Sequence, residues 1–231
     1  MSNEMDNKNS NFEAVYLPSN EPYLGRESVF HFDKVIISCL ETNVKIAAYT
    51  HRAELSELQK AACQIIPQGI NLALTIRELI RQGYLFGALV LMRPLIERAA
   101  IISYLHVHPD ELEVWQKGWQ FRERPSLAKM IETMSGGDVD ITVAKQLCET
   151  FSHIVHGDPI SSQWNLVPLS NGGLGYSVGK VIKDSELCDF ICFQSYCYLI
   201  VLMGMMTAYF PNVTTSNVDI ENEKKDGHSK Q

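Results

Sequence analysis

Apolar residues recur along most of this chain at steps of three and four residues, the spacing that places them on one face of an α-helix. The first such pattern begins near Glu27, and a second covers about residues 53–82. Pro67 is expected to divide the second region, because the residue before a proline avoids the helical conformation. Gly83 then separates it from a third stretch, residues 84–107. The first half of the chain is therefore expected to be helical.

The third stretch is apolar nearly all round and carries charge at one place, Arg93, Glu97 and Arg98. A helix that is apolar on every face is normally central to its fold, so these charges are expected to be partly buried. Arg93 and Glu97 are four residues apart and share a helix face, while Arg98 points away from it. Pro94 lies between them and predicts a kink or a restart of the helix.

Capping residues mark two shorter helices after this stretch. Asp110 is an expected N-cap, and Glu113 three residues later completes the pattern of a capping box. Ser126 can cap a helix at residues 127–134. Both helices are expected to be short, because turn residues follow them closely.

The period of the pattern changes in the second half of the chain. One more helix is expected to begin at Asp138 or Asp140 and to stop at Gly157. Between residues 163 and 180, apolar and polar residues alternate on both sides of an Asn-Gly turn signal. Alternation around such a dipeptide predicts a β-hairpin.

The last helix is expected over about residues 185–210, and its apolar run is nearly long enough to span a bilayer. Gln194 and Ser195 interrupt this run, Asp189 lies near its start, and basic residues do not cluster at its flanks. These features favour a buried helix and no membrane partner. A membrane anchor remains the alternative interpretation.

Together these patterns predict an all-α fold, a helical bundle of about six or seven helices with one small β-hairpin near residues 163–180. Residues 21–211 are expected to form a single helical domain. The flanking segments, 1–20 and 212–231, are polar and offer few groups to bury, so both are expected to be disordered.

Charge and cysteine content narrow the function classes. The net charge of −7 argues against a general nucleic-acid or anionic-membrane binder, although a small basic site within an acidic protein stays possible. The six cysteines form no CxxC pair and no spacing typical of zinc ligands. The polar N-terminal residues do not resemble a secretory signal. A cytoplasmic location is therefore expected.

The charges at Arg93, Glu97 and Arg98 have two interpretations. Arginine and glutamate on one helix can neutralise each other and specify packing without any chemistry. Alternatively, Arg93 or Arg98 presents a guanidinium to an anionic group such as phosphate, and Glu97 orients it or acts as a base. Both interpretations remain open.

The segment FSHIVHG, residues 151–157, is the second candidate site. Ser152 and His156 are four residues apart on one helix face, and a histidine titrates near neutral pH, which suits acid/base catalysis. His153 and His156 could equally be surface or capping residues. A metal site could be drawn from Glu97, His153 and His156, but the paired Glu-x-x-His motifs of bundle metal sites are absent. No metal and no cofactor are expected.

The segment ALVLMRPLIE, residues 88–97, followed by FSHIVHG, resembles a group of bacterial helical proteins with an Arg-x-x-x-Glu helix and a Ser-x-x-x-His-Gly helix end. That group is similar to the HEPN domains, many of which are ribonucleases or toxins in phage defence and toxin–antitoxin systems. The resemblance implies a helical bundle, a homodimer, and a metal-independent site that cuts RNA at the dimer cleft. It also implies an antitoxin or another protein as a possible partner.

HEPN ribonucleases carry an arginine and, a few residues later, a histidine on a late helix. The match to this motif here is Arg26 and His31, near the start of the chain. From the resemblance we expect Arg93 to bind phosphate, His156 to act as general acid and base, and Glu97 to hold Arg93. This geometry requires the central helix and the helix that ends at Gly157 to be neighbours.

Two alternatives to a ribonuclease remain. The first is a non-catalytic helical interaction module, in which the charges specify packing and a partner binds elsewhere. The second is a protein anchored to a membrane by residues 190–210, which recovery of the chain in a detergent-free soluble fraction would exclude.

Overall fold

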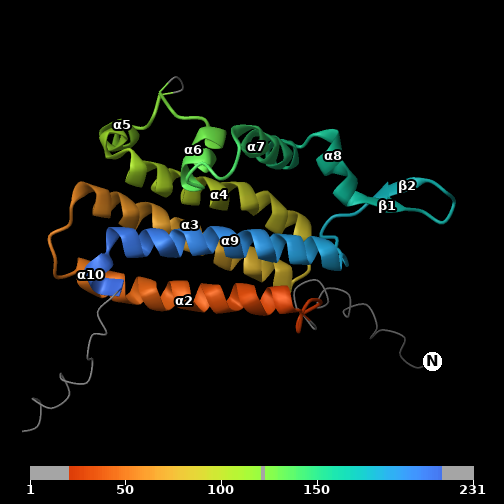
Figure 1. Ribbon diagram of the computed structural model, residues 1–231. Helices are drawn as coiled ribbons and strands as arrows, with labels where there is room; N and C mark the ends of the chain where they lie inside the picture. The colour runs from red at the N-terminus through yellow and green to blue at the C-terminus, as the bar shows by residue number, and fades with distance from the viewer. Residues whose placement is uncertain (1–20, 121–122, 215–231) are drawn as a thin grey trace, which may run out of the picture.

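Four long helices form the bundle in the computed structural model, which describes residues 21–120 and 123–214 (Figure 1). The helix α4 packs against α3 and α9, and α9 also packs against α2. The bounds of the four helices are α2 Glu27–Thr50, α3 Glu57–Arg81, α4 Leu85–Val107 and α9 Ser185–Tyr209.

A second set of shorter elements covers the other side of α4 (Figure 1). The helices α6 and α7 pack directly on α4, and a small antiparallel hairpin of β1 and β2 projects from the end of this layer. The bounds are η1 Pro109–Glu111, α5 Leu112–Gln116, α6 Leu127–Met134, α7 Ile141–Val155, α8 Pro159–Ser162, η2 Gln163–Asn165, β1 Leu166–Pro168 and β2 Leu174–Tyr176. The short helix α10, Pro211–Thr214, instead packs on α2 and α9 (Figure 1). The predicted all-α bundle with one β-hairpin is confirmed.

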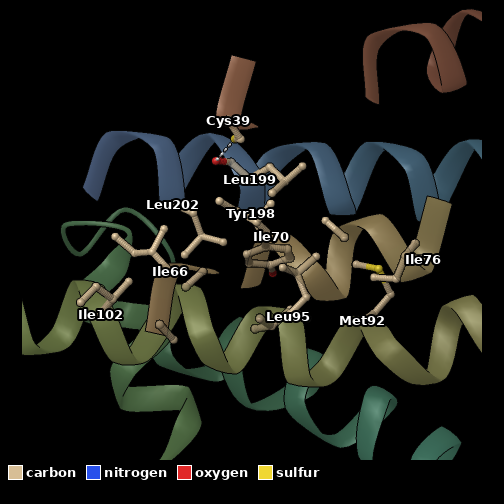
Figure 2. Close-up of a cluster of buried hydrophobic side chains, with 14 of the residues drawn as sticks. Cys39, Ile66, Ile70, Ile76, Met92, Leu95, Ile102, Tyr198, Leu199 and Leu202 are labelled. Carbon is tan, nitrogen blue, oxygen red and sulfur yellow. Dashed lines mark hydrogen bonds between the residues drawn. The ribbon is translucent and has the colours of Figure 1, made fainter. Parts of the chain in front are cut away.

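The central position of α4 follows from its apolar residues on every side. Met92, Leu95 and Ile102 are fully buried and face apolar residues of α3 and α9, among them Ile66 and Leu202 (Figure 2). Burying a side chain of this size contributes about 1.5–3 kcal/mol relative to leaving it exposed. Because α6 and α7 cover the remaining side, the charged residues of α4 are held between two layers.

Two prolines lie inside continuous helices. The division predicted at Pro67 is therefore wrong, and of the kink or restart predicted at Pro94, the restart does not occur. Each proline removes one main-chain hydrogen bond. On both sides of Pro67, α3 buries isoleucines in the core, and this packing outweighs the local preference. Gly69, two residues later, brings α3 close to α9: a Cβ here would lie 2.5 Å from Leu202 Cδ1.

The predicted capping box at Asp110 and Glu113 is also wrong. Pro109 begins a 3₁₀ turn whose N-cap is His108, and no side chain caps it. Glu113 instead forms an exposed ion pair with Lys117 at 2.5 Å. The predicted caps Ser126 and Asp140 are confirmed, each accepting a hydrogen bond from a main-chain N–H in the first turn of its helix.

The predicted flanking segments fall mainly outside the described residues, which exclude 1–20 and 215–231. Residues 212–214 are described, and they belong to the short helix α10 instead of the expected disordered tail. Val213 explains this difference, because its side chain is buried against the bundle.

The helix α9 is the one helix in the described part of the chain that is long and apolar enough to cross a membrane. Of its most apolar 18-residue window, 39% is buried. The helix packs on α2, α3 and α4. Core helices share this length and composition, so these properties do not distinguish a membrane span from a core helix.

Candidate functional site

The two motifs singled out in the sequence meet through Arg93. Arg93 lies on α4, and its Nη1 donates a hydrogen bond to Ser152 Oγ on α7. Its Nε donates to Glu97 Oε1, one helical turn away, at 3.4 Å. The central helix α4 and the helix α7, which ends before Gly157, are therefore neighbours, as expected.

These two contacts, from Glu97 on its own helix and from Ser152 on α7, orient the guanidinium of Arg93. Ser152 accepts from Arg93 and donates in turn to the main-chain oxygen of Cys148 at 2.6 Å, which holds the hydroxyl in place. The Nη2 of Arg93 has no hydrogen-bond partner among the described residues. It is not one of the buried atoms that lack a partner, so it is accessible to a ligand. A planar guanidinium held in this way can offer its remaining N–H groups to a phosphate or carboxylate.

Glu97 is shared by three arginines. Besides Arg93, Arg98 Nη1 lies 3.9 Å and Arg124 Nη2 lies 4.0 Å from Glu97 Oε2. The Glu97 side chain is 22% exposed, so water screens these charges only in part. Three guanidinium groups around one carboxylate leave a local excess of positive charge in a chain whose net charge is −7. Such a cluster attracts anions.

A surface groove of about 560 Å³ begins at Glu97 and Arg98 and runs between α3, α4 and α5. This volume lies within the range of small-molecule sites. The groove residues are Gln64, Gln68, Arg98, Trp115, Trp119 and Arg124. Of the residues that line the groove, only Glu97 and Arg98 were among the candidates from sequence. The segment 115–124, WQKGWQFRER, nevertheless carries a usable signal, because it combines aromatic and basic residues within ten positions.

His156 is exposed and forms the C-cap of α7. Its side chain makes no hydrogen bond or ion pair with the described residues, and no contact links it to Arg93. It follows Ser152 by one turn, which is about 6 Å along a helix axis. Gly157 comes next with φ +73°, a left-handed conformation that favours glycine and ends the helix. His156 is therefore near the Arg93 cluster and open to solvent.

His153 lies on the same helix but has a partner of its own. Its Nδ1 contacts Asp158 Oδ2, and both side chains are exposed. This contact fits the interpretation of His153 as a surface residue at a helix end.

Arg26 and His31 lie at a different place, at the start of α2. The carboxylate of Asp189 accepts two hydrogen bonds from Arg26, one of them at 2.8 Å, and another from Ser28. The hydrogen bonds from Arg26 lower the pKa of Asp189. His31 Nε2 lies 3.3 Å from Glu27 Oε1. Both candidates line a second pocket, of about 640 Å³, which shares no lining residue with the groove at Glu97.

Among the described residues, no group of three or more His, Cys, Asp or Glu side chains could hold a metal ion.

Comparisons with known proteins found no matching protein-family model, curated protein or solved structure. The resemblance to HEPN proteins therefore remains a prediction from the two short motifs.

Proposed function

We propose that this protein is a metal-independent ribonuclease, acting as a toxin or as a component of phage defence. Arg93 binds the phosphate, Glu97 and Ser152 position Arg93, and His156 transfers protons. The observation that supports this proposal is the contact between Arg93 and Ser152. It joins a guanidinium whose Nη2 has no partner among the described residues to Ser152, and the exposed His156 follows Ser152 by one turn of α7.

The chemistry uses the RNA's own 2′-hydroxyl as nucleophile. His156 takes the proton from this hydroxyl, the 2′-oxygen bonds to the adjacent phosphorus, and the bond from phosphorus to the 5′-oxygen breaks. The leaving oxygen receives a proton from the imidazolium, and a 2′,3′-cyclic phosphate results. Arg93 stabilises the charge that develops on the phosphate oxygens. General acid–base catalysis of this kind contributes about 10²–10⁴-fold in rate.

The test is incubation of the purified protein with total RNA and with a defined single-stranded RNA in EDTA. We expect cleavage that survives chelation, yields a cyclic phosphate end, and stops when the 2′-hydroxyl next to the cut is replaced by hydrogen. Arg93→Ala and His156→Ala should abolish it, while His153→Ala, an exposed histidine on the same helix, should retain it. Cleavage that His156→Ala leaves intact would contradict the proposal.

A second candidate, a helical interaction module, is supported by the surface of α2. Phe30, Ile37 and Val44 are 57%, 52% and 67% exposed, and they recur every seven residues, as in the seam of a coiled coil. Leu40, 38% exposed, occupies the intervening position of the same seam. Exposed apolar residues in such a row mark an interaction surface more often than scattered ones do.

We propose a homodimer through this seam. Such a dimer would not place the Arg93 site at the dimer cleft that the resemblance to HEPN proteins implies, because α2 lies on the side of the bundle away from α6 and α7 (Figure 1). The proposed dimer has its two-fold axis perpendicular to α2, so the two copies of α2 run antiparallel. Lys34 and Glu41 flank the seam, and in an antiparallel pair Lys34 of one copy lies near Glu41 of the other. Light scattering should report a dimer that Ile37→Glu converts to a monomer. A monomeric wild-type chain would exclude this assignment without bearing on RNA cleavage.

A further inference from the structure

We propose that the groove beside Glu97 binds an unpaired nucleobase of single-stranded RNA. This inference rests on the proposed ribonuclease function and specifies its substrate. The groove combines three kinds of group that recognise a nucleotide: aromatic rings, amides and guanidinium groups. Aromatic side chains stack on any unpaired base, amides hydrogen-bond to its edge, and arginines contact the phosphates.

The aromatic wall consists of Trp115 on α5 and Trp119 in the loop that follows. Trp119 is braced within the protein by an edge-on contact with Tyr104, at 6.4 Å between ring centroids. A ring held in place loses little conformational entropy when a base stacks on it. Trp119 Nε1 is also a buried donor without a hydrogen-bond partner among the described residues. Because this N–H is inaccessible to solvent, the proposal uses the ring of Trp119 and not its donor.

The opposite wall carries two amides one turn apart on α3, Gln64 and Gln68. The Oε1 of Gln68 accepts a hydrogen bond from Arg98 Nε at 2.8 Å, which orients this amide and leaves its two N–H groups available. Each amide offers both donors and acceptors, the pattern found along the edge of a nucleobase. Base pairing would occupy that edge, so the groove is suited to an unpaired base.

The phosphate contacts link this groove to the cleavage site. Arg98 and Arg124 line the groove, and Arg93 lies on the other side of Glu97. All three arginines surround the same carboxylate, so a base held in the groove lies next to the phosphate that Arg93 would bind. The groove would therefore hold the nucleotide adjacent to the cut.

The experiment measures binding without cleavage, through the intrinsic fluorescence of tryptophan. The chain has three tryptophans, and Trp164 stacks on Phe86 away from the groove. A Trp164→Phe background therefore reports on the groove alone. The probe is a single-stranded oligouridine with 2′-O-methyl groups, which lacks the nucleophilic hydroxyl and cannot be cut by the proposed route.

We expect the oligomer to quench the fluorescence, and uridine monophosphate to do so more weakly, whereas inorganic phosphate has no effect. In the same background, Trp115→Ala should weaken binding of a fluorescently labelled oligomer about tenfold to a hundredfold, the usual effect of removing a stacking ring. Gln64→Ala, an exposed position, should weaken it by a smaller factor without affecting the fold. A duplex of the same length should bind at least tenfold more weakly than the single strand.

The outcomes separate this inference from the proposed function. Binding by the groove residues in a protein that cuts no RNA would support the groove and refute the ribonuclease. Cleavage that Trp115→Ala and Gln64→Ala both leave unchanged, with no quenching by the oligomer, would overturn the groove and leave the ribonuclease standing. Equal affinity for duplex and single strand would also overturn it.

Discussion

Glu97→Gln removes the one carboxylate from a cluster of three guanidinium groups. The substitution keeps the size of the side chain, so the packing of α4 is preserved. The local charge rises from +2 to +3, because Arg93, Arg98 and Arg124 all lie within 4.0 Å of this carboxylate. We expect the variant to be less stable and to bind anions more tightly than the wild-type protein.

The magnitude follows from the three contacts. A hydrogen bond between charged groups contributes about 1.5–3 kcal/mol, and the contact with Arg93 is long at 3.4 Å, so the lower value applies. The contacts with Arg98 and Arg124 add charge attraction, which water screens in part because the Arg124 side chain is 46% exposed. Breaking a buried ion pair costs about 3–5 kcal/mol. We therefore expect a loss of about 2–4 kcal/mol, or about 4–16 °C in Tm for a chain of this size.

The assay is urea unfolding followed by circular dichroism, with and without inorganic phosphate. Phosphate at a hundred times its Kd would restore about 2.7 kcal/mol to the variant. Arg93→Ala is the comparison: it removes the hydrogen bonds to Glu97 and Ser152, while Glu97 keeps its contacts with Arg98 and Arg124. The loss of stability should be of similar size, about 2–4 kcal/mol, and phosphate should restore less of it, because one of the three guanidinium groups is gone.

The control is Glu113→Gln, which removes the carboxylate of an exposed ion pair with Lys117 and should leave Tm unchanged. A Glu97→Gln variant as stable as the wild type would refute the view that Glu97 balances the arginines. A loss of stability that phosphate does not reverse would refute the cluster as an anion site.

Two further predictions concern packing and pH. Gly204→Ala meets no atom within 4 Å and should stabilise the protein by up to about 1 kcal/mol in urea unfolding, through the helix propensity of alanine. Gly69→Ala should lose that gain and destabilise by up to about 2 kcal/mol, because its Cβ would lie 2.5 Å from Leu202 Cδ1 and the buried Leu202 side chain must shift. An equal effect of both substitutions would contradict the close approach of α3 and α9. The hydrogen bonds from Arg26 lower the pKa of Asp189, so their stabilisation is complete above about pH 4 and is lost as the pH falls through the lowered pKa. Asp189→Asn should therefore be less stable near pH 7 and lose less stability on acidification, and an unchanged pH profile of urea unfolding would contradict this.

Much of the fold could be predicted because its signals are local. Ser126 and Asp140 cap their helices through hydrogen bonds two or three residues along the chain, so neighbouring residues suffice to identify them. The Asn-Gly turn between alternating residues likewise marks the hairpin. Pro67 misled the prediction because its effect depends on long-range packing: buried side chains on both sides hold α3 together across it.

In the candidate site, too, some contacts could be predicted from the sequence and others could not. The sequence by itself determined that Arg93 and Glu97 share a helix face, since helical geometry brings residues four apart together. Tertiary structure alone decided that Ser152, 59 residues away, holds Arg93, and that Arg124 approaches Glu97. These contacts depend on how α4 packs against α7 and on the path of the loop before α6. Such packing is set by the fit of many side chains, and no short motif records it.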